Sequence, residues 1–314
     1  MPDIDDYTQS IALDPSNTLA YFNRGLAYSR QREYDDAIVD FTHMIALDPH
    51  NADAYINRGL AYDAHDRHDA AISDFTRAIE IDPQCNTYYY RGLAYHAEDQ
   101  YDGALADFTQ AIILDPQFAN AYVNRGVVLF FQDLFDMAIT DYNRAIEIDP
   151  QCRTYYNRGL AYSRQAQYDP AIVDFTSSIQ KEPSYAATVY HERGLAYVAQ
   201  HRYNEAIADF THTLERNPGY LSAFYYRAHA YSAQQQDELA IADFTWAIEL
   251  EPQFALAYRE RGAIYYRQGQ EVHALADYRT YEALTGHLEP LMREQIKAMA
   301  ALQAPAIPPD AESL

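Results

Sequence analysis

One pattern of about thirty-four residues occurs eight times between Tyr21 and Gly286. Each copy has a small residue, an Ala twelve positions later and an aromatic residue four positions after that Ala. The small residues are Gly25, Gly59, Gly92, Gly126, Gly159, Gly194, Ala228 and Gly262; the alanines are Ala37, Ala71, Ala104, Ala138, Ala171, Ala206, Ala240 and Ala274; the aromatic residues are Phe41, Phe75, Phe108, Tyr142, Phe175, Phe210, Phe244 and Tyr278. A period of this length is typical of stacked repeats, in which a unit that cannot bury its own apolar face packs against its neighbours.

Within one copy, two helical patterns follow each other. Tyr21, Gly25 and Tyr28 are spaced by four and three residues, which places them on one face of a first helix. A second helix is predicted to begin near Asp35, whose carboxylate can cap free backbone N–H groups, and to carry an apolar stripe from Ala37 onward. A Pro closes seven of the eight copies and disfavours helix at the residue before it. The sequence therefore predicts sixteen repeat helices in antiparallel pairs and no strand.

The segments YFNRGLAY, AIVDF and LDP of the first copy, with their equivalents in the others, resemble the tetratricopeptide repeat. The resemblance covers about nine tenths of the chain. It departs from the family in one respect, because the usual Leu before the Gly is Arg in every copy. The resemblance implies an all-α, right-handed superhelical solenoid of eight helix-turn-helix repeats. In that family the first helices line a concave groove that binds extended peptides or helices of partner proteins.

The two ends of the chain differ from the repeats. Residues 1–17 align with the second helix of the first repeat, so they are predicted to form a partial repeat without a first helix. Residues 18–286 hold the eight repeats. Residues 287–302 carry an apolar stripe opposite charged residues, which predicts the capping helix that a repeat array needs. Residues 303–314 contain three Pro and are predicted to be a flexible tail.

The chain carries a net charge of −23 and has a pI near 4.6. A surface of this charge repels phosphate backbones and anionic lipids, so we expect no nucleic acid and no membrane surface as a partner. We expect a protein or peptide of neutral to basic charge instead. No apolar run reaches membrane-spanning length, and the opening MPDIDDYTQS lacks the features of a signal peptide, so a cytoplasmic location is predicted.

No motif in the sequence assembles a catalytic or metal site. His65 and His68 lie three residues apart, but they fall near a predicted turn without a clear further ligand. HERGL at His191 differs from the HExxH zinc motif, and neither a GxSxG elbow nor a phosphate-binding Gly-rich loop is present. Cys85 and Cys152 occupy the same position in two repeats that are not adjacent, which places them too far apart for a disulfide. The sequence predicts a protein that is not an enzyme, with no metal and no cofactor.

An Arg precedes every small residue, and an Asp follows sixteen positions after every Arg. The Arg residues are Arg24, Arg58, Arg91, Arg125, Arg158, Arg193, Arg227 and Arg261; the Asp residues are Asp40, Asp74, Asp107, Asp141, Asp174, Asp209, Asp243 and Asp277. Since the predicted turn lies about midway, antiparallel helices place each Arg and Asp at about the same height. Each Arg could also reach the Asp of the preceding repeat, and Asp6 in the partial repeat favours that arrangement. We favour a ladder of buried pairs that fixes the register of the repeats over a clamp for an anionic ligand.

The resemblance also places a partner-binding surface on the first helices of the first five repeats. The predicted groove residues are Phe22, Asn23, Leu26, Ile56, Asn57, Leu60, Tyr89, Leu93, Val123, Asn124, Val127, Phe130, Phe131, Tyr156, Asn157 and Leu160. The Asn residues are expected to be available for main-chain contacts. Repeat four is distinctive, because Phe130 and Phe131 replace small or polar pairs. Either at least one ring is exposed as a hot spot, or Leu129, which stands where the other repeats have Tyr, draws both rings inward.

Three functions are consistent with these observations. The leading hypothesis is a non-catalytic adaptor that binds a segment of a partner protein in the groove. The alternatives are a regulatory or targeting subunit or domain of a larger enzyme or complex, and a structural scaffold that self-assembles. Tyr7 and Ile11 of the partial repeat lack their usual neighbour, which predicts weak self-association through the N-terminal edge.

Overall fold

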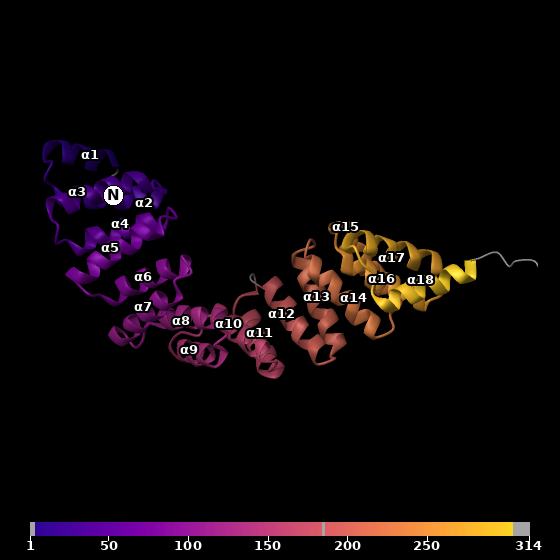
Figure 1. Cartoon of the computed structure of the whole chain (residues 1–314). Helices are drawn as coiled ribbons and strands as arrows, with labels where there is room; N and C mark the ends of the chain where they lie inside the picture. Colours follow the sequence, from indigo (N-terminus) through magenta and orange to yellow (C-terminus); the bar gives the residue numbers. More distant parts are fainter. Residues whose placement is uncertain (1–3, 184–185, 304–314) are drawn as a thin grey trace, which may run out of the picture. The chain divides into compact units, whose positions relative to one another are not determined.

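The structure, a computed structural model, describes residues 4–183 and 186–303, in which it has eighteen α-helices and no strand (Figure 1). These are the sixteen predicted repeat helices with one helix before them and one after them. The chain consists of two compact units, residues 1–165 and 166–314. The all-α class and the succession of helix pairs predicted from the sequence are confirmed.

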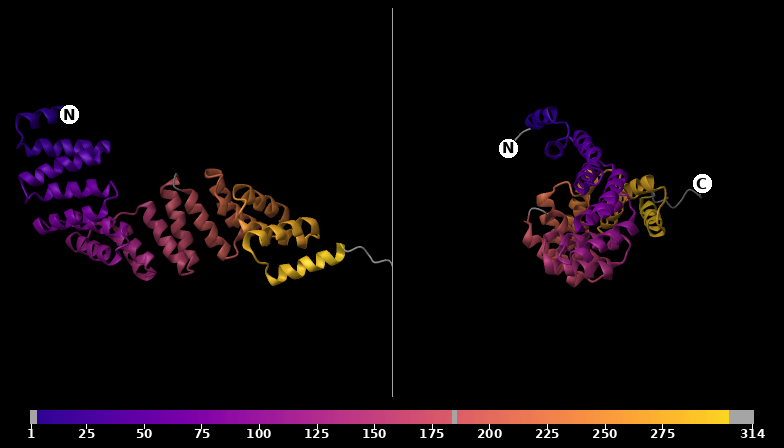
Figure 2. Two further views of the ribbon diagram at one scale, coloured as in Figure 1. Left: turned by 45° about the horizontal axis from the view of Figure 1, so that its top comes forward. Right: turned by 90° about the vertical axis from the view of Figure 1, so that its left-hand side faces the viewer.

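The first unit contains ten helices that lie side by side in chain order (Figure 2). Each helix packs mainly against the helices just before and just after it. The helices are α1 (Ile4–Leu13), α2 (Thr18–Gln31), α3 (Tyr34–Leu47), α4 (Ala52–Asp63), α5 (His68–Ile81), α6 (Cys85–Ala97), α7 (Tyr101–Leu114), α8 (Ala119–Phe131), α9 (Phe135–Ile148) and α10 (Cys152–Arg164). This is the contact pattern of a repeat array, in which a unit touches only its neighbours.

The second unit continues the same alternation of first and second helices. Its helices are α11 (Tyr168–Lys181), α12 (Ala186–Ala199), α13 (Tyr203–Arg216), α14 (Leu221–Ala233), α15 (Asp237–Leu250), α16 (Ala255–Arg267), α17 (Glu271–Thr285) and α18 (Pro290–Gln303). Here too the strongest packing joins helices that are consecutive in the chain, such as α12 with α13 and α16 with α17.

In six of the repeats the small residue, a Gly, packs against the aromatic residue sixteen positions later. A Cβ atom built on Gly25 would lie 2.8 Å from Cε1 of Phe41, and one built on Gly59 would lie 2.7 Å from Cε1 of Phe75. Both rings are fully buried. The two helices of a repeat can approach this closely because the Gly leaves room for the ring, which fills the space at the density of a protein interior.

The Arg and Asp residues form a ladder of bidentate ion pairs. Arg24 donates from Nε and Nη2 to the carboxylate of Asp40, at 2.9 and 2.7 Å. The same two-bond geometry joins Arg58 to Asp74, Arg91 to Asp107, Arg125 to Asp141, Arg193 to Asp209, Arg227 to Asp243 and Arg261 to Asp277. Every one of these pairs lies within a single repeat.

These pairs confirm the predicted ladder of Arg and Asp residues, but the preference for the Asp of the preceding repeat, which Asp6 suggested, is wrong. The preceding repeat supplies a hydroxyl instead, because Arg24 Nη1 donates to Thr8 Oγ1 at 3.0 Å and Arg58 Nη1 donates to Thr42 Oγ1 at 3.0 Å. One edge of the planar guanidinium matches one carboxylate and uses two of its five N–H groups, so Nη1 is left to donate to a neutral acceptor. Each of these seven Arg residues thus joins both helices of its own repeat to the helix before them. Arg158 contacts the preceding repeat by donating from Nη1 to Asn143 Oδ1 at 2.6 Å.

The turn within each repeat contains a residue with left-handed backbone. In the first repeat this residue is Arg32, whose φ is 64° and whose N–H bonds to the carbonyl of Ser29 at 3.1 Å. The equivalent residues are Asp66, Asp99, Asp133, Ala166, His201, Gln235 and Gly269. Only the last of these is a Gly, so the other seven turns hold a side chain in a conformation that L-residues disfavour.

The second helix of the first repeat begins one residue earlier than its predicted cap. Helix α3 starts at Tyr34, and its N-cap residue Glu33 makes no side-chain capping bond. Asp35 lies in the first turn, where its charge favours the positive end of the helix without capping it, so the predicted cap is wrong. Asn51 before α4 is a true cap, because its side chain accepts a bond from Ala54 N at 3.0 Å.

Helix α18 closes the second unit as the predicted capping helix. Met292 and Met299 are buried and pack with Tyr281 of α17 in one apolar cluster. The domain boundaries stay predictions, and the predicted tail lies outside the described residues from residue 304 onward.

Candidate functional site

The sixteen predicted groove residues lie on the first helices α2, α4, α6, α8 and α10, all in the first unit. Phe131 is exposed and the other fifteen are half-buried. None of them is fully enclosed in a repeat, so their side chains can be reached by another molecule. The structure nevertheless brings only some of them together.

A pocket of about 300 Å³ lies among helices α6, α8, α9 and α10. Five predicted groove residues line it: Val127, Phe130, Phe131, Asn157 and Leu160. His96, Tyr142 and Arg153 complete its lining. An apolar depression with a few polar groups is how proteins usually hold a small ligand or a single side chain of a partner.

The two Phe rings of repeat four take different positions. Phe130 packs against the buried cluster of its repeat and meets Phe135 edge-on, with 5.4 Å between ring centroids. Phe131 keeps 60% of its surface exposed, and its ring lies 5.9 Å from the ring of His96. At least one of the two rings is therefore exposed, because most of the Phe131 surface is open to solvent, while its role as a hot spot stays a prediction.

Two buried polar atoms of this pocket have no hydrogen-bond partner among the described residues: His96 Nδ1 and Asn157 Nδ2. Burial lowers the pKa of His96, so its imidazole is neutral at pH 7. Leaving a buried polar atom without a partner costs about 1–3 kcal/mol. The two atoms therefore mark places where a bound molecule could supply hydrogen-bonding groups.

The other predicted residues do not line this pocket. Asn124 Nδ2 donates to the Tyr89 hydroxyl at 3.1 Å and to the carbonyl of Asn120 at 2.9 Å. Both hydrogens of that amide are used, so a main-chain contact by Asn124 would have to be made by its side-chain oxygen. Phe22 lines a separate pocket of about 210 Å³ with Leu19 and Met44. Besides Tyr89 and Asn124, eight predicted residues line neither pocket: Asn23, Leu26, Ile56, Asn57, Leu60, Leu93, Val123 and Tyr156.

Three lining residues are absent from the predicted set: His96, Arg153 and Tyr142. Arg153 precedes Tyr156 by three residues and so lies one turn earlier on the same face of α10. If the predicted groove had been extended by one helical turn toward the start of α10, this spacing would have included Arg153. Tyr142 is the core aromatic residue of repeat four, and its burial raises the pKa of its hydroxyl. Nothing in the sequence marks that its ring also borders the pocket.

No group of three His, Cys, Asp or Glu residues suited to a metal ion occurs in residues 4–183 and 186–303. His68 Nδ1 lies 2.8 Å from Asp63 Oδ1, and His65 Nδ1 lies 3.7 Å from Asp35 Oδ1. In the same part of the chain, no helix combines the length and apolar character needed to cross a bilayer.

Sequence comparison with protein families returns one kind of match along most of the chain. The profiles are described as tetratricopeptide repeat or TPR repeat, and they match residues 18–51, 52–85, 92–133, 119–152, 153–184, 187–220 and 228–269. Among curated proteins, none matches the sequence significantly.

Similar solved structures share the helix-pair repeats. The C-terminal part of a TPR repeat-containing protein from Cytophaga hutchinsonii is 20% identical, covers 75% of this chain and 97% of its own, and superposes with a TM-score of 0.64. MamA is 27% identical over 54% of this chain and 93% of its own, with a TM-score of 0.50. YrrB, described as a TPR protein with an unusual peptide-binding site, is 21% identical over 63% of this chain and 98% of its own, with a TM-score of 0.51.

Proposed function

The chain belongs to the tetratricopeptide repeat family, whose repeats are protein–protein interaction scaffolds and are in general not catalytic, and we propose that it is a non-catalytic adaptor for one partner protein. A segment of the partner binds along the first helices of the first unit. Its principal anchor is the pocket that Phe130, Phe131 and Asn157 line.

The observation that carries this proposal is the combination of exposed apolar surface and unsatisfied polar atoms in one pocket. Phe131 offers an exposed ring of the kind that dominates binding energy at interfaces. Asn157 Nδ2 can donate to a main-chain carbonyl of the bound segment, and the neutral His96 can take whichever role its tautomer allows. An apolar side chain next to a main-chain carbonyl is available in any extended peptide, so the pocket suits a polypeptide.

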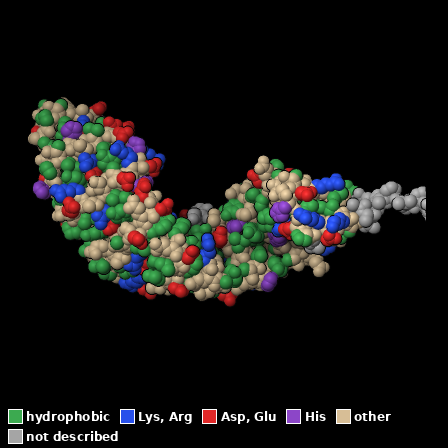
Figure 3. All heavy atoms as spheres, viewed as in Figure 1, with side chains coloured by type: hydrophobic (Ala, Val, Ile, Leu, Met, Phe, Trp, Pro, Cys, Tyr) green, Lys and Arg blue, Asp and Glu red, His purple; other side chains and the backbone are tan. Residues whose placement is uncertain are grey.

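Charge sets the class of partner. The net charge of −23 favours association with a neutral to basic protein. On the face seen in Figure 3, acidic and basic side chains are interspersed with apolar ones. The excess of acidic residues therefore acts mainly on the rate of encounter, while the pocket determines which segment remains bound. A cytoplasmic meeting place stays a prediction from the sequence.

Site-specific crosslinking tests where the partner binds. Benzoylphenylalanine in place of Phe131 should crosslink one partner reproducibly from cell extract. The same residue in place of Ile113, an exposed apolar side chain of α7, is the matched control. Capture at both positions with equal yield would mean that apolar exposure alone explains the result.

Affinity for the captured partner tests the anchor itself. Phe130→Ala with Phe131→Ala should weaken binding by about 2 kcal/mol or more, or about thirtyfold, with helical content unchanged. The adjacent exposed pair Ile113 and Leu114 supplies the control double variant, which should bind normally. Asn157→Leu should weaken binding while keeping the pocket's volume. A folded double Phe variant that binds as well as the unmodified protein would place the site elsewhere.

A further inference from the structure

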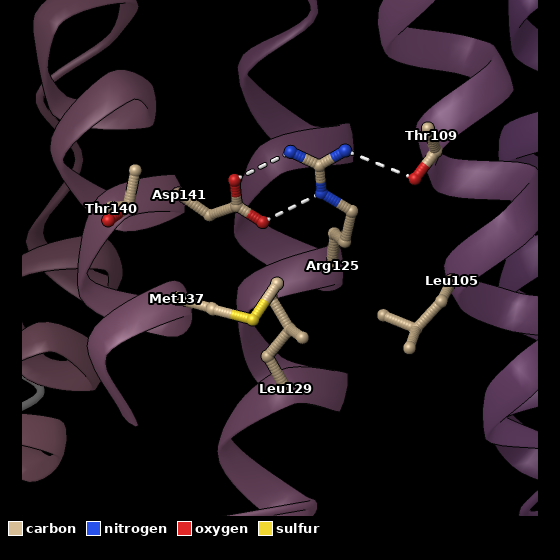
Figure 4. A pocket seen from close by; sticks show the side chains of 7 residues that line it. All are labelled: Leu105, Thr109, Arg125, Leu129, Met137, Thr140 and Asp141. Atoms are coloured by element: carbon tan, nitrogen blue, oxygen red, sulfur yellow. Dashed lines mark hydrogen bonds and ion pairs between the residues drawn. The ribbon is translucent and has the colours of Figure 1, made fainter. Parts of the chain in front are cut away.

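A third pocket, of about 340 Å³, lies among helices α7, α8 and α9 (Figure 4). Its walls are Leu105, Thr109, Arg125, Leu129, Met137, Thr140 and Asp141. In Figure 4, Leu129 and Met137 meet on one side of the pocket, Leu105 points into it from α7, and the Arg125 guanidinium lies at one end. Arg125 and Leu129 are one turn apart on α8, whereas Phe130 and Phe131 lie on a different face.

The other repeats show what normally occupies this space. Seven of the eight carry a Tyr where repeat four has Leu129: Tyr28, Tyr62, Tyr95, Tyr162, Tyr197, Tyr231 and Tyr265. All seven rings are half-buried. In each of these repeats the Arg guanidinium lies over that ring, at 5.8–6.0 Å from its centroid. Arg125 has no such partner at position 129, because Leu129 has no ring.

Repeat three shows the second wall of the same space. A Cβ atom on Gly103 would lie 3.0 Å from the Tyr95 ring, so this ring packs directly on the start of α7. The equivalent residue of repeat four is Met137, whose side chain is 56% exposed. Repeat four has therefore lost the Tyr and gained a flexible Met at the position that faced it. The Met does not refill the space, since Arg125 and Met137 both line the open pocket.

We propose that this pocket receives a tyrosine side chain of a partner polypeptide, which takes the place of the Tyr that the other seven repeats supply themselves. The site lies outside the groove surface and goes beyond the function proposed above. The inserted ring would lie over Arg125 as Tyr95 lies over Arg91, and its edge would contact Leu105, Leu129 and Met137. Arg125 is fixed for this contact, because it is bonded to Asp141 at 2.7 and 2.8 Å and to Thr109 at 3.1 Å.

The chemistry of the walls favours an aromatic ring over an aliphatic side chain. A guanidinium attracts the face of an aromatic ring. The thioether of Met137 adds a favourable contact at a ring edge and can move aside to admit it. A phenol is preferred because Thr140 lines the pocket, and its hydroxyl, which donates to the Asp136 carbonyl, can still accept a bond from the phenol O–H.

The test uses 4-methylphenol, which is the tyrosine side chain cut at Cβ, and N-acetyl-tyrosinamide, which adds the main chain. Both are titrated into the full chain while the methyl NMR signals of Leu129 and Met137 are followed. We expect saturable shifts at both methyl groups, with a dissociation constant on the order of 1 mM for 4-methylphenol. Leu129→Tyr with Met137→Gly copies repeat three and should weaken binding at least tenfold.

Tyr95→Leu is the reciprocal variant and should create a second site in repeat three, beside Gly103. The proposal fails if 4-methylphenol binds that variant at repeat three but leaves Leu129 and Met137 of the unmodified chain unshifted, because Met137 would then fill the pocket. It also fails if 4-methylphenol binds and N-acetyl-tyrosinamide does not, because the pocket would then admit a free phenol and not a side chain on a polypeptide. If 4-methylphenol bound equally well to the unmodified chain and to the variant with Leu129→Tyr and Met137→Gly, its site would lie elsewhere.

Discussion

At the scale of single residues, the Arg before the small residue of a repeat makes contacts of three kinds. Arg91 bonds Asp107 of its own repeat at 2.7 and 2.8 Å, donates to Thr76 of the preceding repeat at 2.9 Å and lies over the Tyr95 ring. These side chains are only partly reached by solvent, with 15% of Arg91 and 6% of Asp107 exposed. Removing either partner leaves the other charged group without compensation in a poorly solvated place.

Arg91→Ala should therefore lower the free energy of unfolding by about 3 kcal/mol, as for a broken buried pair. Arg77 is the matched control, because its pair with Glu80 lies on the surface of α5. Arg77→Ala should have no measurable effect. Denaturant unfolding measures the free energy of unfolding of both variants. Equal stability of the two variants would mean that the ladder contributes nothing beyond an exposed ion pair.

A second prediction concerns pH and His96. Burial lowers the folded-state pKa of His96 below its ordinary value of 6.5, so the unfolded chain takes up this proton first. The contribution of His96 to stability is fully present above about pH 6.5 and is lost as the pH falls through the folded-state pKa. Between pH 7 and 5, the free energy of unfolding of the His96→Gln variant should thus depend less on pH than that of the unmodified chain. Parallel stability curves would contradict this account.

At the scale of elements, the turn between the two helices of a repeat contains avoidable strain. Gln235 has a φ of 61°, and the equivalent residue two helices later, Gly269, has a φ of 72°. The turn keeps this geometry because Gln236 N donates to the carbonyl of Tyr231 at 2.9 Å, which ends α14. Left-handed backbone costs a residue with a side chain about 1 kcal/mol or more, and a Gly almost nothing.

Gln235→Gly should accordingly raise the free energy of unfolding by about 1 kcal/mol, and Gly269→Ala should lower it by a similar amount. Both changes are read by thermal unfolding of the full chain. If the two substitutions changed stability in the same direction, the left-handed conformation would not be the controlling factor.

The elements that could be predicted from the sequence are those that depend on contacts inside one repeat. The spacing from Gly25 to Phe41 predicts two antiparallel helices, because only that arrangement brings a small residue against a ring. The partner of Arg24 across the repeat boundary could not be predicted, since Asp6 and Thr8 differ by half a helical turn and the register between repeats decides between them. The pocket beside Phe131 was only partly foreseen for the same reason, because it combines side chains from three repeats.

At the scale of the whole molecule, stability in a repeat array is passed only between neighbours. Met299 of α18 is 1% exposed and shares a cluster with Tyr281 of α17. Met299→Ala should cost about 2 kcal/mol locally. Hydrogen exchange should then accelerate in α17 and α18 and stay unchanged in α2 to α5. Acceleration throughout the chain would show that the array unfolds as one cooperative unit.

The N-terminal edge gives one further prediction at this scale. No residue of α1 is fully buried, and Leu13 is 83% exposed. Exposed apolar residues of this kind favour weak self-association, which sedimentation should detect at about 1 mM protein. Tyr7→Ser with Leu13→Ser should abolish it. A strictly monomeric protein at that concentration would remove the basis for this prediction.

Seven of the eight Arg residues bond a Thr of the preceding repeat, which also makes these repeats interchangeable. Deleting residues 52–84 would join Asn51 directly to Cys85, which begins the equivalent first helix of the next repeat. Arg91 would then face Thr42, the residue that Arg58 now contacts. A gene of this kind can gain or lose a whole copy by a single recombination event and still encode a chain in which adjacent repeats keep their Arg–Thr bond. Selection could therefore adjust how many partner contacts the protein offers without redesigning its interior.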